Sequence, residues 1–383
     1  MRFDLLIKGG EIIDPALGYF GPGDVAVQRD RVAAVARDIP AASAFQVIDA
    51  SGLLVFPGFV DIHMHGGFMK SFQDGEADVR FLCDKLPSTG VTGVAPTLAP
   101  RSVEQGVSAV RGIRASKGCP GADIVGIHFE GPYFSPKRNA SMHLPAQTDP
   151  TPEHTMAMAD GDLSDVILVC VATELPGAMA YIKWAISKGL KVETCYTTAS
   201  SAQIYEAADL GMTQLSHLFN GFEPMTHKAD GPVAACLIDD RLYAQLICDG
   251  RHVVPVFIHL TLKTKGIERC LGITDAGNFM GMPEGHYKTD IREVNIVDGI
   301  VRDMTGLMIS GHNSWDQMMR RAKDAVGLTL EQIGTLYGEN PCLSMGITDR
   351  GKIEVGRRAD FTLTDHELHV KKTIILEKVY YSA

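Results

Sequence analysis

The stretch Phe56–Gly66, with the sequence FPGFVDIHMHG, contains the features from which the fold can be inferred. An apolar run reaches the Pro57–Gly58 turn, continues as a short strand, and ends in two histidines one residue apart. Side chains alternate between the two faces of a strand, so His63 and His65 point to one side and Met64 to the other. Two imidazoles on one side of a strand end are suited to binding a divalent metal such as zinc. The same pair is also compatible with two partly buried, hydrogen-bonded histidines, so evidence from further along the chain is needed.

Composition is typical of a globular protein with a large core. The chain has 383 residues, 45% hydrophobic and 21% charged, and its 36 basic and 46 acidic residues give a formal charge of −10. This acidity argues against general binding to nucleic acids or anionic membranes, which requires a basic surface. An anionic small substrate is still compatible, because the local charge of a pocket can oppose the net charge.

Cysteine usage and the terminus indicate the compartment. The eight cysteines contain no Cys-x-x-Cys pair and no regular spacing, a pattern typical of reduced, mostly buried thiols. The first ten residues lack the hydrophobic region of a signal peptide. No stretch has the about eighteen uninterrupted apolar residues of a membrane helix. We therefore predict a cytoplasmic protein without membrane or nucleic-acid partners.

The chain contains two kinds of region, which differ in their pattern of apolar residues. Short apolar runs separated by turns fill residues 1–55 and return in 346–383, which predicts one small β-sandwich domain built from both termini. Residues 56–345 alternate strand, loop and helix. The eight strand candidates in this region are the run before His63 and then 92–97, 124–129, 166–171, 191–195, 214–217, 242–247 and 271–274. Eight such units predict an α/β fold, a (β/α)8 TIM-type barrel with its active site at the carboxyl ends of the strands.

Residues that bind metals or transfer protons follow the predicted strands repeatedly. Such residues close several strand candidates: His128 and Glu130, His217, Asp249 and His252, and Asp275. Each one alone is more often structural, and we expect His128 to be a supporting or packing histidine. Their recurrence at strand ends predicts an active site on one face of the barrel.

Several motifs together carry a resemblance to a known family. The main ones are PGFVD at 57–61, GIHFEGPY at 126–133, HLFN at 217–220, DGRH at 249–252 and TDA at 274–276. With these the chain resembles the amidohydrolase superfamily, and within it the N-acetylglucosamine-6-phosphate deacetylases, over nearly its whole length. The resemblance implies a metal-dependent hydrolase that deacetylates an N-acetyl amino sugar phosphate. It also implies one or two divalent ions, with zinc as the expected metal, and a homodimer.

The resemblance further implies a role for individual residues. Asp275 would take a proton from a metal-activated water and later give it to the leaving nitrogen. The implied metal ligands are His63, His65, Glu130, His217 and Asp275. The implied substrate contacts are His143, Asn220, Lys228 and His252.

Two positions depart from the family pattern. The family has a metal-binding histidine twenty-one positions before the equivalent of His217, where this chain has Tyr196, whose phenol titrates near ~10. A metal would then shift toward the His63–His65 pair, or use the Cys195 thiolate, although strand alternation points Cys195 away if Tyr196 faces inward. The family also carries an arginine for the sugar phosphate where this chain has Lys228, which keeps the charge but not the planar two-point grip.

These departures keep other functions open. One is an amidohydrolase reaction on a cyclic amide or another N-acyl compound. The other is a non-hydrolytic sugar-phosphate enzyme, or a sugar-phosphate binding protein, on the same fold.

Overall fold

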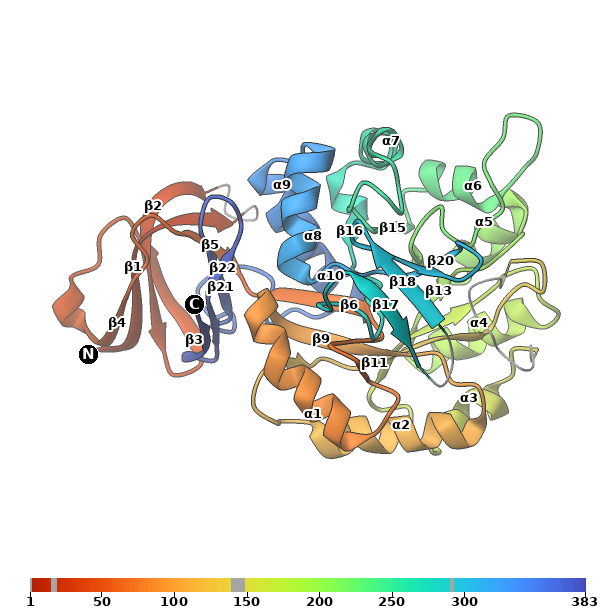
Figure 1. Ribbon diagram of the computed structural model, residues 1–383, viewed down its shortest axis with the longest axis horizontal. Helices are drawn as coiled ribbons and strands as arrows, with labels where there is room; N and C mark the ends of the chain where they lie inside the picture. The colour runs from red at the N-terminus through yellow and green to blue at the C-terminus, as the bar shows by residue number, and fades with distance from the viewer. Residues whose placement is uncertain (1, 15–18, 139–148, 290–292) are drawn as a thin grey trace.

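The computed structural model describes residues 2–14, 19–138, 149–289 and 293–383. Both ends of the chain contribute to one eight-stranded sheet, drawn in red and dark blue at the left of Figure 1. Its strands are β1 (Phe3–Asp14), β2 (Tyr19–Gln28), β3 (Arg31–Ala36), β4 (Ala44–Asp49), β5 (Leu54–Pro57), β21 (Phe361–Thr364), β22 (Val370–Ile375) and β23 (Lys378–Ser382). The order is β23-β22-β21-β5-β1-β2-β3, with β4 paired to β1. Strand β21 runs antiparallel to β5, with Phe361 opposite Pro57, so the two termini form one β unit as the sequence predicted.

The middle of the chain forms the predicted barrel. Its eight parallel strands are β6 (Phe59–Met64), β9 (Val91–Leu98), β11 (Ile127–Tyr133), β12 (Val166–Val171), β13 (Lys191–Thr194), β14 (Gln214–Leu215), β15 (Tyr243–Leu246) and β16 (Cys270–Gly272). Each overlaps one of the strand candidates, which confirms the TIM-type fold. Most strand residues are fully buried, as expected for parallel strands packed on both faces.

The residues after β16 close the barrel against β6. Met64 and Ala276 form a parallel bridge. The Asp275 amide donates to the His63 carbonyl at 3.0 Å, and the His65 amide donates to the Ala276 carbonyl at 2.8 Å. The first and last strands of the barrel are therefore adjacent, and the polar residues that follow them meet at one place.

Helices surround the barrel in the order expected for alternating units (Figure 1). They are α1 (Glu76–Lys85), α2 (Val103–Ser116), α3 (Pro152–Met158), α4 (Ala178–Ser187), α5 (Ser201–Asp209), α6 (Pro232–Ile238), α7 (Pro255–Lys265), α8 (Trp315–Arg321), α9 (Leu330–Gly334) and α10 (Asn340–Met345). Local sequence explains several of their starts. Ser200 and Gln203 form a capping box at α5, as Ser314 and Gln317 do at α8.

A small antiparallel sheet between β16 and α8 was not predicted. It contains β17 (Gly285–Lys288), β18 (Glu293–Val297), β19 (Ile300–Asp303) and β20 (Met308–Ser310), and lies across the near face of the barrel in Figure 1. Val294, Ile296 and Val301 form its buried core with Phe279. The β18–β19 hairpin turns at Asp298 and Gly299, both with positive φ, as an Asp-Gly type I′ turn requires.

Candidate active site

His63 and His65 lie at the end of β6 and face the same group of carboxylates. The His63 Nε2 atom is 3.4 Å from Glu130 Oε1 and 3.5 Å from Asp275 Oδ1. The His65 Nε2 atom is 3.1 Å from Glu130 Oε2 and 3.5 Å from the same Asp275 oxygen. Met64 between them is buried in the opposite direction, in the hydrophobic core. The alternation predicted for this strand is therefore present.

Glu130 and His217 complete the cluster from two other strands of the barrel. Glu130 lies in β11, and His217 follows β14, with its Nε2 atom 2.9 Å from Glu130 Oε1. The Nδ1–H of His217 donates to the carbonyl of Asn220 at 3.0 Å, which orients Nε2 toward the carboxylate. Five residues separated by up to 212 positions in sequence, 275 − 63, thus converge at one face of the barrel.

The backbone is strained at three residues that follow barrel strands at this face. His217 has φ 27°, Asp275 has φ 48° and Tyr196 has φ 43°, all in the left-handed region that residues with a side chain seldom adopt. Such strain persists only where surrounding structure imposes it, and it concentrates at functional sites. The strained positions are at the carboxyl ends of β13, β14 and β16, where a barrel places its chemistry.

The donor atoms fit a divalent cation. His63, Glu130 and His217 form one group of suitable atoms within 4.8 Å of one another, and His63, His65 and Asp275 form another. The Nε2 atom of His63 is buried and has no hydrogen-bond partner among the described residues. An imidazole nitrogen left in this state beside carboxylates, 0% exposed, is the expected arrangement for a ligand atom.

Electrostatics point to the same conclusion. Burial alone lowers the pKa of an imidazole, yet the carboxylates of Glu130 and Asp275 outweigh burial and raise the pKa of His63 to about 10. The same two carboxylates outweigh burial at His65 and raise its pKa to about 9. Burial raises the pKa of Glu130, but His63 and His217 overcome this effect and hold it well below its usual value. The pocket favours positive charge, which a bound cation supplies.

A buried hydrogen-bond network supports His63 from inside the barrel. Ser216 Oγ lies 3.0 Å from His63 Nδ1 and donates its own hydrogen to Gln245 Oε1 at 3.1 Å, so His63 Nδ1–H must be the donor to Ser216. Gln245 Nε2 in turn donates to Glu193. This arrangement fixes the tautomer of His63 and directs the Nε2 lone pair to the cluster.

His128 belongs to this supporting network. Its Nε2 is 3.0 Å from Glu193 Oε1, and its Nδ1 is 3.1 Å from Thr97 Oγ1. Burial lowers the pKa of His128, with only partial compensation from Glu193, so the ring is neutral. No motif in the sequence singled out Ser216, Gln245 or Glu193. Their only link to the site in the sequence was their position in or beside barrel strands, close to predicted metal ligands.

The predicted substrate contacts are in different surroundings. His252 follows β15, and its Nδ1–H donates to Asp249 Oδ2 at 2.7 Å, while its Nε2 is buried without a hydrogen-bond partner in the described structure. Asn220 lies beside His217, and its backbone carbonyl accepts the hydrogen bond from His217 Nδ1–H described above. Lys228 is exposed, on the loop between β14 and α6. His143 lies outside the described residues.

Tyr196 and Cys195 occupy the end of β13, where the family pattern has a histidine. The Tyr196 ring packs against His217, with centroids 5.1 Å apart, and against Phe134, at 4.8 Å. A Cβ atom at Gly221 would come within 2.6 Å of the Tyr196 ring, so glycine there leaves room for it. Cys195 is fully buried in a small cluster with Cys170 and Phe134, and burial raises its pKa far above the usual value. The donor groups found around His63 include neither residue.

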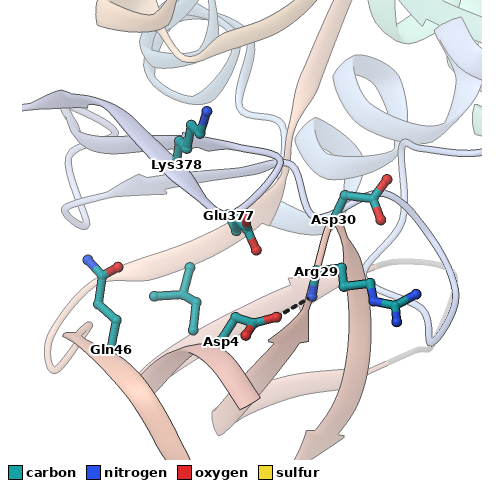
Figure 2. Close-up of a pocket in the computed structure, with 7 residues that line it drawn as sticks. Asp4, Arg29, Asp30, Gln46, Glu377 and Lys378 are labelled. Atoms are coloured by element: carbon teal, nitrogen blue, oxygen red, sulfur yellow. Dashed lines mark hydrogen bonds between the residues drawn. The ribbon is translucent and has the colours of Figure 1, made fainter. Parts of the chain in front are cut away.

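The structure contains one cavity beside the barrel strands and another in the terminal sheet. One, of about 290 Å³, opens between the loop after β14 and the start of α7 and is lined mainly by apolar side chains together with His252. The other, of about 540 Å³, lies in the terminal sheet (Figure 2). Its lining residues include Asp4, Arg29, Glu377 and Lys378. The backbone N–H of Arg29 donates a hydrogen bond to the side-chain carboxylate of Asp4. Only the first cavity adjoins residues that follow barrel strands.

A (β/α)8 barrel with imidazoles and carboxylates converging at its carboxyl face defines a metal-dependent hydrolase of the amidohydrolase type. No protein-family model matches the chain. The N-acetylgalactosamine-6-phosphate deacetylase of Escherichia coli O157:H7 is 30% identical over 358 residues, covering 90% of this chain and 91% of that protein. The N-acetylglucosamine-6-phosphate deacetylase of Lysinibacillus sphaericus is 26% identical over 373 residues, or 97% and 96% of the two chains.

Solved structures agree with these relatives. The N-acetyl-D-glucosamine-6-phosphate deacetylase of Mycobacterium smegmatis was solved as an aspartate-to-alanine variant in complex with N-acetyl-D-glucosamine-6-phosphate. It matches with a TM-score of 0.90 and 28% identity over 100% of both chains. The chain belongs to the amino sugar phosphate deacetylases of the amidohydrolase superfamily. It is accordingly a metal-dependent hydrolase that acts on an amide C–N bond. Within the described parts of the chain, every helix is too short or too polar to span a bilayer.

Proposed function

We propose that this protein removes the acetyl group from an N-acetylated amino sugar 6-phosphate, producing acetate and the free amino sugar phosphate. The observation that carries the proposal is the convergence of His63, Glu130, His217 and Asp275 in a chain whose relatives are named for this reaction. N-Acetylglucosamine-6-phosphate is the leading substrate. Its galactosamine isomer is the alternative, because the relative at 30% identity is named for that sugar.

The proposed metal is zinc, since imidazoles mixed with carboxylates suit this ion. The proposed ligands are His63, His65, Glu130, His217 and Asp275. When bound, the ion would lower the pKa of a water molecule and polarise the amide carbonyl. Because all three donor groups among the described residues share His63, we expect one ion per chain.

Asp275 is the proposed general base and acid. Its side chain is 18% exposed, more open than Glu130 at 1%, so it borders both the cluster and the mouth of the barrel. Burial raises the pKa of Asp275, but His65, His63 and His217 outweigh burial and lower it. The carboxylate is therefore ionised before the reaction and can accept the proton of the attacking water. The same oxygen then returns the proton to the leaving nitrogen of the amino sugar.

His252 is the proposed contact to the substrate from the β15 side. Asp249 holds its Nδ1–H, which leaves Nε2 directed away from the carboxylate and without another partner among the described residues. His252 also lines the apolar cavity beside the loop after β14. Asn220 and Lys228 of that loop, together with His143, complete the proposed set of substrate contacts.

We also propose a cytoplasmic homodimer. The support for the dimer is a group of exposed apolar side chains on and beside α6 and α7, namely Met225, Ile238, Val254, Val256 and Phe257, with Ile238 72% exposed and Val256 68% exposed. The support for the compartment is the set of eight free cysteines. Light scattering on the purified chain would give twice the mass of one chain, and Val256→Glu would reduce it; a monomeric wild type would contradict the dimer.

The deacetylase proposal is tested by acetate release. The zinc-loaded protein is incubated with N-acetylglucosamine-6-phosphate, N-acetylgalactosamine-6-phosphate, an N-acetyl amino acid and a cyclic amide. We expect turnover on at least one sugar phosphate, and loss of that turnover in Asp275→Asn. Turnover confined to the amino acid or the cyclic amide would contradict the proposal.

A further inference from the structure

Arg251 is a half-buried arginine at the mouth of the barrel whose guanidinium has no partner in the described parts of the chain. It follows β15 in the stretch Cys248–His252, and its backbone N–H donates to Asp249 Oδ1 at 2.8 Å. Among the described residues, none forms a side-chain hydrogen bond or ion pair with the guanidinium. Arg114, another half-buried arginine, pairs with Asp165 at 2.8 Å. An unpaired charge of this kind is costly unless a ligand compensates it.

Asp249 does not neutralise Arg251, because its oxygens are already used. Oδ1 accepts the backbone N–H groups of Arg251 and His252, each at 2.8 Å. Oδ2 accepts His252 Nδ1–H at 2.7 Å and is 3.5 Å from the side-chain nitrogen of Asn313. The aspartate thus fixes the backbone that presents Arg251 and leaves the guanidinium free. The unbalanced charge has a local effect, since burial and the nearby Arg251 together lower the pKa of Arg321.

The guanidinium lies beside the β18–β19 hairpin, on the Asp275 side of the barrel mouth. A Cβ atom at Gly299 would come within 2.9 Å of Arg251 Nη1 and 3.8 Å of both Asn313 Oδ1 and His312 Nδ1. His312 directly follows Gly311, whose amide donates to the Asp275 carbonyl at 2.8 Å. Backbone contacts therefore connect the surroundings of Arg251 to the proposed general base. Glu284 and Asp298 flank the hairpin, but neither forms an ion pair with Arg251.

We propose that Arg251 binds the phosphate of the substrate in this protein. The proposal rests on the function proposed above and names the cation that this chain uses for a phosphate monoester. A planar guanidinium offers two parallel N–H donors to phosphate oxygens, which a lysine ammonium does not. Lys228, the other candidate, is exposed and lies two residues before Asp230, whose carboxylate reduces its attraction for an anion.

Binding of the reaction products separates phosphate recognition from catalysis. Isothermal titration calorimetry on the metal-loaded protein compares glucosamine-6-phosphate with glucosamine, for the wild type, Arg251→Gln, Arg251→Lys and Lys228→Ala. We expect Arg251→Gln to bind glucosamine-6-phosphate roughly 10- to 100-fold more weakly while its affinity for glucosamine is unchanged. Arg251→Lys should recover part of the loss, because it restores the charge without the two-point grip. Arg37→Gln, which removes an exposed arginine after β3, is the matched control and should behave as the wild type.

Three results would overturn the inference. They are equal affinity of the wild type for both products, an unchanged affinity of Arg251→Gln for glucosamine-6-phosphate, and a specific loss in Lys228→Ala without one in Arg251→Gln. An equal loss for both ligands in Arg251→Gln also contradicts it, since that loss would reflect a structural role. Acetate release is measured on the same samples. A wild type that prefers the phosphorylated product but hydrolyses no acetyl sugar would refute the deacetylase proposal and leave the assignment of Arg251 intact.

Discussion

Removing the hydroxyl of Ser216 tests whether the buried network holds His63 ready for a metal. Ser216 is fully buried, and its Oγ atom lies 3.0 Å from His63 Nδ1. The Ser216 hydroxyl also donates a hydrogen bond to Gln245 Oε1. In Ser216→Ala the Nδ1–H of His63 loses this acceptor. Gln245 Oε1 is 3.4 Å from the same nitrogen and can replace it only in part.

The expected loss follows from these distances. Removing the hydrogen-bond partner of a metal-binding histidine costs about 10- to 100-fold in metal affinity. Because Gln245 is close enough to compensate in part, we expect the lower end, about tenfold or about 1.4 kcal/mol. Zinc affinity is measured by competition with a chromophoric chelator at constant pH. Ser344→Ala, a buried serine that donates to a carbonyl within α10, is the matched control. Zinc affinity within twofold of the wild type in Ser216→Ala would refute the reasoning.

Four further outcomes are expected. Asp275→Asn should lower kcat by orders of magnitude, since the base is lost; near-normal turnover would show that another group takes the proton. His63→Ala combined with His65→Ala should remove the metal, and full occupancy by elemental analysis would mean that Glu130 and His217 suffice. Tyr196→His should raise the metal content above that of the wild type, which an unchanged ratio would contradict. Burial raises the pKa of Asp165, but Arg114 and Lys117 outweigh burial and lower it, so its stabilising effect is present above the unfolded pKa near ~4 and is lost as pH falls through the folded value. Asp165→Asn should therefore lower the thermal midpoint more at pH 7 than at pH 3, and equal effects at both pH values would exclude this role.

The barrel was predictable because its strands have a strong local signature. Runs such as Val166–Val171 are apolar and rich in β-branched residues, and polar residues follow them at the point where the strand ends. The same regularity located the site, since His63, Glu130, His217 and Asp275 all come at strand ends. The structure places these four together, while the chemical roles assigned to them remain proposals.

The β17–β20 sheet was missed for a physical reason. Its strands have three to five residues, as in Met308–Ser310 and Glu293–Val297, and bury only part of each strand, so hydrophobic periodicity is weak. The Asp298–Gly299 turn was the strongest available signal, and one dipeptide does not predict four strands. The hairpin of that sheet lies beside Arg251, the proposed phosphate contact.

The hydrogen-bond network around His63 also could not be predicted from the sequence. Ser216 is 153 positions from His63, and Gln245 is 182 positions away. Polar residues inside a barrel strand look like ordinary alternation until the register between strands is known. Closure of the barrel, through Met64 and Ala276, sets that register.

Anomalous diffraction at the zinc edge, from crystals of the zinc-loaded protein, tests the central claim most directly. We predict one strong peak per chain, at about 2.0 to 2.2 Å from His63 Nε2 and from a carboxylate oxygen of Glu130 or Asp275. A peak away from these residues, or a loaded chain in which His63 Nε2 binds no ion, would contradict it.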